Sequence, residues 1–240
     1  MIVLFTSNPA IGISAQINPA NHFQEKLNQF LCSPVRLLFV ASNPVTTEHN
    51  DQYAMLVQAF LDNAGVTLTG CDILDERSAG SSAALIERAG RIVLAGGHAP
   101  TQNAFFERIG LADSLRSFDG VVIGISAGSM NSAKDAFLTP DEEGEGADPL
   151  FRYEYPGLGL ADIHIIPHYE WARTGILDGK KLVEELILPY SQGKVLYGLP
   201  DGSWILSTGE ENILYGEAWL LSDGHEEKIS ENGDVLQLPV

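Results

Sequence analysis

Ser126 lies in the segment Gly124-Ile125-Ser126-Ala127-Gly128, where small residues surround a serine that could act as a nucleophile. An apolar run at 120–123 comes before this segment and small residues follow it, which predicts a buried strand, a sharp turn and a helix. On such a turn the serine hydroxyl is exposed, and the flanking glycines avoid collisions with the neighbouring strand and helix. The alternative is an ordinary strand–turn–helix connection that carries an incidental serine.

Partners for Ser126 can be sought by one rule. In an open parallel sheet, functional groups gather beyond the carboxyl ends of the strands. Three polar segments directly follow predicted strands: Gly96-Gly97-His98 after 91–95, Pro167-His168 after 163–166 and Pro200-Asp201-Gly202 after 195–199. We therefore expect an imidazole, a carboxylate and a glycine-rich backbone to meet Ser126 at one rim of the sheet.

These groups are the parts of a serine hydrolase. In this interpretation Ser126 attacks a carbonyl carbon and His168 takes its proton, then gives that proton to the leaving group. Asp201 holds the imidazole in the right tautomer. The backbone N–H groups of Gly97 and Ala127 form the oxyanion hole.

The other histidines fit catalysis less well. His164 lies inside an apolar strand, and His22 and His49 lie near the starts of predicted helices in polar surroundings. His225 lies in a turn-like segment, 222–227. It leaves one alternative open, because Ser126, Asp201 and His225 follow the chain order of an α/β-hydrolase triad.

Length and charge limit the classes of protein that the chain can represent. A chain of 240 residues that is 45% hydrophobic suits one large α/β domain, and we see no domain boundary. Its formal net charge of −18 disfavours nucleic acids and anionic membranes as partners. No stretch approaches the length of a membrane span. Cys32 and Cys71 lie far apart, which favours reduced thiols in a cytoplasmic protein.

Apolar runs alternate with helical periodicity along residues 1–133, which predicts a parallel, doubly wound sheet. The predicted strands are 2–6, 35–41, 66–69, 91–95, 120–123, 163–166 and 195–199. The predicted helices are 20–31, 53–64, 82–89, 101–109, 111–118 and 180–188. Residues 204–240 indicate antiparallel hairpins on one edge. The acidic, glycine-rich segment 140–149 is either a solvated surface loop or a cover over the site.

At these residues the chain resembles the peptidase E (aspartyl dipeptidase) and cyanophycinase family of serine peptidases. The resemblance covers about residues 1–216, in order. It includes Ser7-Asn8, Gly96-Gly97, the segment around Ser126, Pro167-His168 and the segment 198–202. It implies a flavodoxin-like sheet akin to that of class I glutamine amidotransferases. The family triad of Ser, His and Glu would correspond to Ser126, His168 and Asp201, so the acid is one methylene shorter here.

The resemblance also marks substrate-facing residues. Asp141 falls where peptidase E has an Asp after its serine, and it is the reserve candidate for the orienting or substrate-facing carboxylate. His98 replaces an Asn that lines the family's substrate pocket, which puts aspartyl specificity in doubt. An aspartyl substrate needs a cationic partner, for which Arg173 is the leading candidate beside Lys180 and Arg152.

The sequence thus predicts a serine peptidase, a dipeptidase or exopeptidase acting on small peptides with an N-terminal Asp as one option. Two alternatives stay open: an amidotransferase-like protein that binds a small ligand without catalysis, and an esterase. No cofactor and no metal are expected. The expected partner is a small peptide substrate, and a homodimer is left open.

Overall fold

The computed structural model describes residues 1–30 and 34–240 and centres on an eight-stranded mixed sheet. Its strands, in spatial order, are β16 (Val235–Leu238), β13 (Asn212–Tyr215), β12 (Trp204–Ser207), β1 (Ile2–Thr6), β5 (Val121–Ile125), β4 (Arg91–Leu94), β2 (Val35–Val40) and β3 (Leu68–Leu74). The neighbouring strands β1, β5, β4, β2 and β3 are parallel to one another. β12, β13 and β16 extend the sheet with antiparallel pairing. The predicted α/β fold with a mostly parallel sheet is confirmed.

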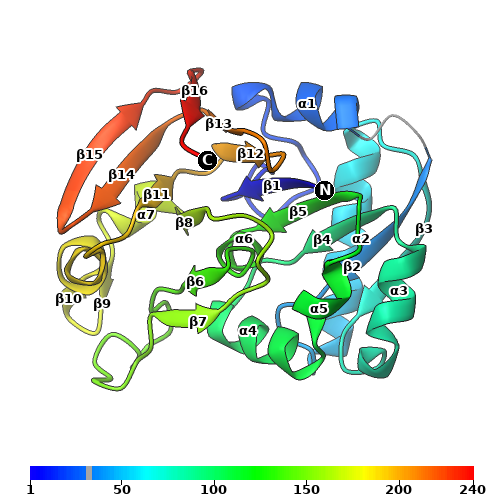
Figure 1. Cartoon of the computed structure of the whole chain (residues 1–240), viewed down its shortest axis with the longest axis horizontal. Helices are drawn as coiled ribbons and strands as arrows, with labels where there is room; N and C mark the ends of the chain where they lie inside the picture. The colour runs from blue at the N-terminus through cyan, green and yellow to red at the C-terminus, as the bar shows by residue number, and fades with distance from the viewer. Residues whose placement is uncertain (31–33) are drawn as a thin grey trace.

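The parallel strands have unbroken apolar sequences because helices cover both faces of the sheet. Alternate residues of a strand enter opposite cores: Leu38 and Val40 pack with α3 to α6, whereas Leu37 and Phe39 pack with α1 and α2. Figure 1 shows this layered arrangement. The helices are α1 (Phe23–Phe30), α2 (Thr47–Asn63), α3 (Ser82–Arg88), α4 (Ala99–Arg108), α5 (Leu111–Leu115), α6 (Ala127–Met130) and α7 (Tyr169–Ala172).

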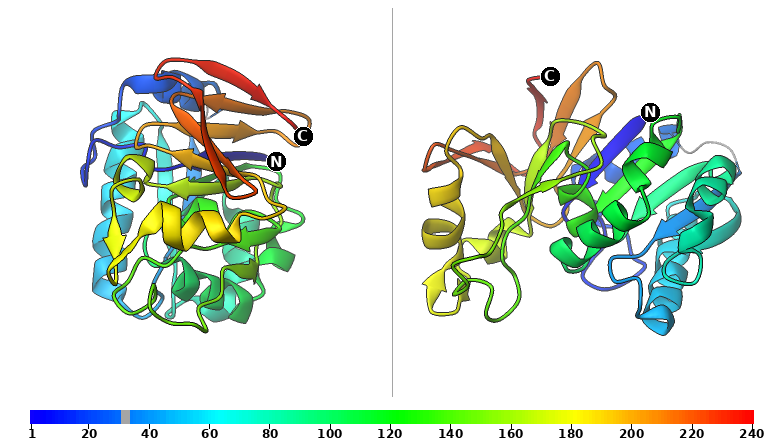
Figure 2. Two further views of the ribbon diagram at one scale, coloured as in Figure 1. Left: turned by 90° about the vertical axis from the view of Figure 1, so that its left-hand side faces the viewer. Right: turned by 60° about the horizontal axis from the view of Figure 1, so that its bottom comes forward.

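A second sheet departs from the expectation of a single wound sheet. It is four-stranded, in the order β15 (His225–Ser230), β14 (Ala218–Ser222), β11 (Leu196–Leu199) and β8 (His164–Pro167). β8 and β11 are parallel to each other, as predicted, but β11 pairs on its other side with β14 of a C-terminal hairpin, and neither strand joins the main sheet. They lie to one side of the molecule (Figure 1, Figure 2). The predicted C-terminal hairpins are therefore divided between the two sheets.

The remaining elements are short. Two strand pairs stand outside both sheets, β6 (Asp135–Phe137) with β7 (Glu154–Pro156) and β9 (Ile176–Leu177) with β10 (Lys180–Lys181). The single-turn 3₁₀ helices are η1 (Ala20–His22), η2 (Ala79–Ser81) and η4 (Leu188–Tyr190). The helix predicted at 180–188 is a wide π-helix, η3 (Leu182–Ile187), that begins after β10.

Leu31 and Cys32, for which a helical position and a reduced thiol were predicted, lie outside the described residues, and Cys71 is a free, half-buried thiol. Within residues 1–30 and 34–240, no helix has the length and apolar character needed to cross a membrane.

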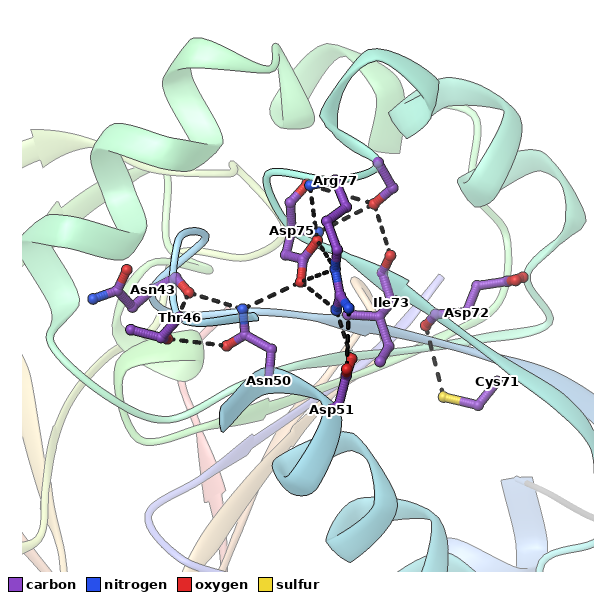
Figure 3. Close-up of polar contacts among 10 residues, drawn as sticks. Asn43, Thr46, Asn50, Asp51, Cys71, Asp72, Ile73, Asp75 and Arg77 are labelled. Atoms are coloured by element: carbon purple, nitrogen blue, oxygen red, sulfur yellow. Dashed lines mark hydrogen bonds and ion pairs between the residues drawn. The ribbon is translucent and has the colours of Figure 1, made fainter. Parts of the chain in front are cut away.

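Polar contacts fix the N-terminal end of α2 against the end of β3 (Figure 3). The fully buried carboxylate of Asp75 accepts hydrogen bonds from the guanidinium of Arg77 and, at 3.3 Å, from the amide of Asn50 on α2. Arg77 also bonds Asp51 on α2. A buried carboxylate is stable only when it is paired and hydrogen-bonded. This network therefore sets the position of a helix that, as shown below, lines the pocket next to Ser126.

Candidate active site

Ser126 occupies the turn between β5 and α6 in a strained backbone conformation, with φ 50° and ψ −110°. A non-glycine residue rarely adopts a positive φ, and such strain is common at catalytic turns. The turn is held because the Ser126 N–H donates to the carbonyl oxygens of Thr6 and Ser7, each at 3.0 Å. The predicted strand, sharp turn and helix are all present at this position.

Glycines make this turn sterically feasible. A Cβ atom added at Gly124 would lie 2.7 Å from the backbone of Ser129, and one at Gly128 would lie 2.2 Å from the carbonyl oxygen of Leu94. Real Cβ atoms do not approach backbone so closely. The two glycines therefore let α6 pack directly on β4 and β5.

We expect Gly128→Ala to lower the free energy of unfolding by about 3 kcal/mol, because β4 and α6 must separate to admit the methyl group. Urea denaturation followed by circular dichroism measures this loss. Gly80→Ala is the matched control, since its added Cβ would meet nothing within 4 Å. Equal midpoints for the two variants would contradict the close packing of α6 on β4.

His168 faces Ser126 directly. It follows β8, and its Nε2 lies 2.7 Å from the Ser126 Oγ while its Nδ1 lies 2.8 Å from Asp201 Oδ1. With the Nδ1 proton donated to the carboxylate, Nε2 is free to accept the serine proton. Its backbone has φ 126°, a second strained position at the site.

The pairing of β8 with β11 explains why His168 and Asp201 meet. Pro167 lies opposite Leu199 in this parallel pair, so the residues that follow the two strands emerge side by side. The three residues predicted to converge do so, and the second sheet delivers two of them to a serine on the main sheet.

Asp201 has further hydrogen bonds that the sequence reasoning did not assign. Its Oδ1 accepts from the Ser7 hydroxyl at 2.7 Å, and its Oδ2 accepts from the Asn8 amide at 3.4 Å. Burial alone would raise the pKa of Asp201, but the hydrogen bonds from His168, Ser7 and Asn8 bring it below its ordinary value. The carboxylate is thus kept charged next to the imidazole.

Ser7, Asn8 and Glu170 complete the support of this acid. The Asp201 N–H donates to the carboxylate of Glu170 on α7, at 3.2 Å to each oxygen. Ser7 and Asn8 follow β1 at its carboxyl end, so the rule that selected His168 and Asp201 could also have selected them. Glu170 carried no comparable signal, because it lies inside a short helix.

Gly97 lies beside the Ser126 turn with φ 147°, in a region that favours glycine. A Cβ atom there would lie 2.3 Å from the hydroxyl oxygen of Ser42. Ala127 is the first residue of α6, so its N–H is among those at the positive end of that short helix. Both predicted oxyanion residues are therefore at the carboxyl ends of β4 and β5, next to the serine.

His98 uses both of its ring nitrogens within the protein. Nδ1 lies 2.7 Å from the Thr101 hydroxyl and caps α4, while Nε2 lies 2.8 Å from Glu145 Oε1. His98 thereby fastens the acidic loop 140–149 next to the site. A substrate contact through its ring would require one of these bonds to break.

Asp141, the reserve acid, lies 3.7 Å from His98 Nε2 with half of its side chain exposed. Burial, together with the nearby charges of Glu145 and Glu142, raises the pKa of Asp141 to about 6, although His98 and His168 oppose this shift. Asp141 is thus close enough to sense His168, but it is Asp201 that bonds the imidazole.

Two other sequence candidates point elsewhere. Arg173 donates from Nε to Glu226 at 2.8 Å, and its guanidinium lies over the ring of Trp219 at 4.9 Å. It is not among the residues that line the pocket at Ser126. His225 begins β15 and is exposed, and His168 occupies the imidazole position at the serine.

A cavity of about 620 Å³ opens on Ser126 and His168. It lies between α2 and the segment 8–14 that follows β1, and the turn Gly96-Gly97 forms part of its wall. A pocket of this size at the carboxyl ends of parallel strands is typical of a small-molecule site. The nucleophile therefore has room beside it for part of a substrate.

The chain resembles known proteins both in sequence and in fold. The model of peptidase family S51 matches residues 10–215. The fold resembles a 1.5 Å crystal structure from Listeria monocytogenes EGD-e of a protein described provisionally as peptidase E, with a TM-score of 0.58 and 15% identity. That match covers 95% of this chain and 98% of the other. No curated protein matches the sequence.

Proposed function

Because this chain belongs to peptidase family S51 and is a serine-type peptidase, we propose that it cleaves small peptides through a triad of Ser126, His168 and Asp201. The observation that carries the proposal is the continuous hydrogen-bonded path from the Ser126 hydroxyl through His168 to Asp201, at 2.7 Å and 2.8 Å. Nucleophile, base and orienting acid in this geometry are the requirements for acyl transfer by a serine.

The reaction would proceed in two steps. Ser126 Oγ attacks the peptide carbonyl carbon while its proton passes to His168 Nε2, and the N–H groups of Gly97 and Ala127 stabilise the oxyanion. His168 then gives the proton to the leaving amine as the peptide C–N bond breaks. Water, deprotonated by the same imidazole, hydrolyses the acyl-enzyme and restores Ser126.

The size of the cavity favours a dipeptidase or exopeptidase over an endopeptidase. The cavity beside Ser126 has a volume of about 620 Å³, which suits one or two residues of a peptide. On another side the acidic loop is fastened by the bond between His98 and Glu145. We therefore expect activity to fall steeply as the peptide is lengthened.

A fluorophosphonate probe tests the proposed nucleophile. We expect stoichiometric labelling of Ser126 in the wild-type protein, located by peptide mass spectrometry, because only an activated serine attacks phosphorus rapidly. His168→Ala is expected to slow labelling by about 10³-fold or more, since the general base is lost. Labelling at another serine, or equal rates in the two proteins, would reject the triad.

A further inference from the structure

We infer that the cavity beside Ser126 binds an apolar side chain of the substrate, such as leucine, and discriminates against aspartate. This inference rests on the proposed peptidase function and specifies its substrate class.

One wall of the cavity is an apolar face of α2. Leu56, Val57 and Phe60 lie three, four and seven positions after Tyr53 on this helix, so the four residues share one side of it. The Tyr53 hydroxyl oxygen accepts a hydrogen bond from the Gly96 N–H at 3.3 Å. Tyr53 therefore adds an aromatic ring to this wall, and its hydroxyl lies at the turn Gly96-Gly97.

The opposite rim is the turn around Ile13. Ile13 is 98% exposed although it is a large apolar side chain, and it lines the cavity. The turn is held in place because Ile11 N–H donates to the Gln16 carbonyl and Asn63 on α2 donates to the Ala15 carbonyl, both at 2.8 Å. An apolar residue fixed at a pocket rim is suited to cover an apolar ligand.

The turn is also tied to the triad. The side-chain amide of Asn8 donates to the carbonyl of Gly12 at 3.2 Å and to Asp201 Oδ2 at 3.4 Å. Asn8 thus holds the rim that would contact the substrate at a fixed position relative to Asp201. A side chain bound under Ile13 would hold its own backbone at a defined position relative to Ser126.

The charge of the cavity argues against an acidic side chain. Among the residues that line it there is no lysine and no arginine, and its polar members other than Ser126 and His168 are Asn8, Ser14, His49, Gln52 and Tyr53. The chain carries a net charge of −18, so the overall field repels an anion. A carboxylate placed against Leu56, Val57 and Phe60 would lose its hydration, and the lining offers it no lysine or arginine as a partner.

Dipeptide hydrolysis tests the inference with Ala-Ala, Leu-Ala, Ala-Leu, Asp-Ala and Ala-Asp. We expect leucine at one of the two positions to raise kcat/KM over alanine by roughly 10- to 200-fold, as an added apolar side chain does in a fitted pocket. For aspartate at that position we expect a kcat/KM lower than that for alanine. An aspartate preference, or leucine no better than alanine at both positions, overturns the inference.

Variants of cavity residues test whether the cavity causes the preference for leucine. Leu56→Arg is expected to reduce the leucine advantage at least ten-fold and to raise relative turnover of the aspartyl peptide. Met55→Arg is the matched control, because Met55 is the preceding residue of α2, is 67% exposed and does not line the cavity. Ile13→Asp supplies a second variant, at a side chain that is 98% exposed and therefore buries no apolar surface in the core. Equal selectivity in Leu56→Arg and Met55→Arg also overturns the inference.

Binding separates this inference from the peptidase proposal. Calorimetric titration of the Ser126→Ala protein with the same dipeptides requires no turnover, and we expect the favoured leucyl peptide to bind at least ten-fold more tightly than its aspartyl counterpart. If neither hydrolysis nor labelling of Ser126 occurs, the peptidase function is rejected. The ratio of the two affinities still tests whether the cavity prefers an apolar side chain. Equal affinities, or none, reject the apolar specificity even if hydrolysis occurs.

Discussion

Ser126→Ala is expected to lower kcat for peptide hydrolysis by about 10⁶-fold, the size of effect found when the nucleophile of a serine protease triad is removed. In the proposed mechanism this side chain supplies the atom that forms the acyl-enzyme, and His168 Nε2 lies 2.7 Å from that oxygen. Chromatographic measurement of amine release over days gives the residual rate. The folded structure should persist, because the backbone of residue 126 is fixed by its N–H bonds to Thr6 and Ser7.

Ser117→Ala is the matched control for this loss. Ser117 is an exposed serine shortly before the amino end of β5, whereas Ser126 follows the carboxyl end of the same strand. We expect full activity from it. Residual activity above about 1% in Ser126→Ala, with the contaminating host peptidases excluded by inhibitor, would show that another group attacks the substrate.

The parallel strands could be predicted because burial on both faces leaves unbroken apolar sequences. β3 shows the limit of that signal. It extends over Leu68–Leu74 instead of 66–69, because it is an edge strand whose middle contains Gly70 and Asp72. Asp72 is stabilised there by Arg36 and Arg88, contacts between distant parts of the chain that local periodicity does not reveal. Local patterns likewise did not show that β11 pairs with β14, which places β8 and β11 in a separate sheet.

The site was predictable to the extent that it depends on strand ends. Ser126 and His168 each directly follow a strand and Asp201 follows one after Pro200, and the structure brings the three together although two sheets contribute. The surroundings were less accessible from sequence. His98 fits a substrate-facing position by its place in the chain, but its ring is bonded to Glu145, 47 residues away. Arg173 is a cationic residue that could bind an anionic substrate, but it already forms an ion pair with Glu226 from β15.

Asp201→Asn is expected to lower kcat by about 10⁴-fold while leaving the fold intact, the magnitude associated with the wrong histidine tautomer in a serine triad. If the Asn nitrogen faces His168, Nδ1 must accept and the proton moves to Nε2, which can no longer accept from Ser126. If the Asn oxygen faces His168, the Asn nitrogen meets the side-chain nitrogen of Asn8, which is also a donor. Asn8 is held in that orientation because its nitrogen donates to the Gly12 carbonyl and its Oδ1 accepts from the Ala10 N–H. In either orientation the charge that stabilises the imidazolium is lost.

Asp141→Asn is the matched control, because it removes a neighbouring carboxylate that makes no hydrogen bond to His168 and is half exposed. We expect its kcat to stay within a few-fold of wild type, with any change confined to pH values near 6, where burial places the pKa of Asp141. The pH profile of kcat/KM for both variants provides the measurement. The reverse ranking, with Asp141→Asn inactive and Asp201→Asn active, would transfer the orienting role to Asp141. In that case the short bond between Asp201 and His168 would serve folding alone.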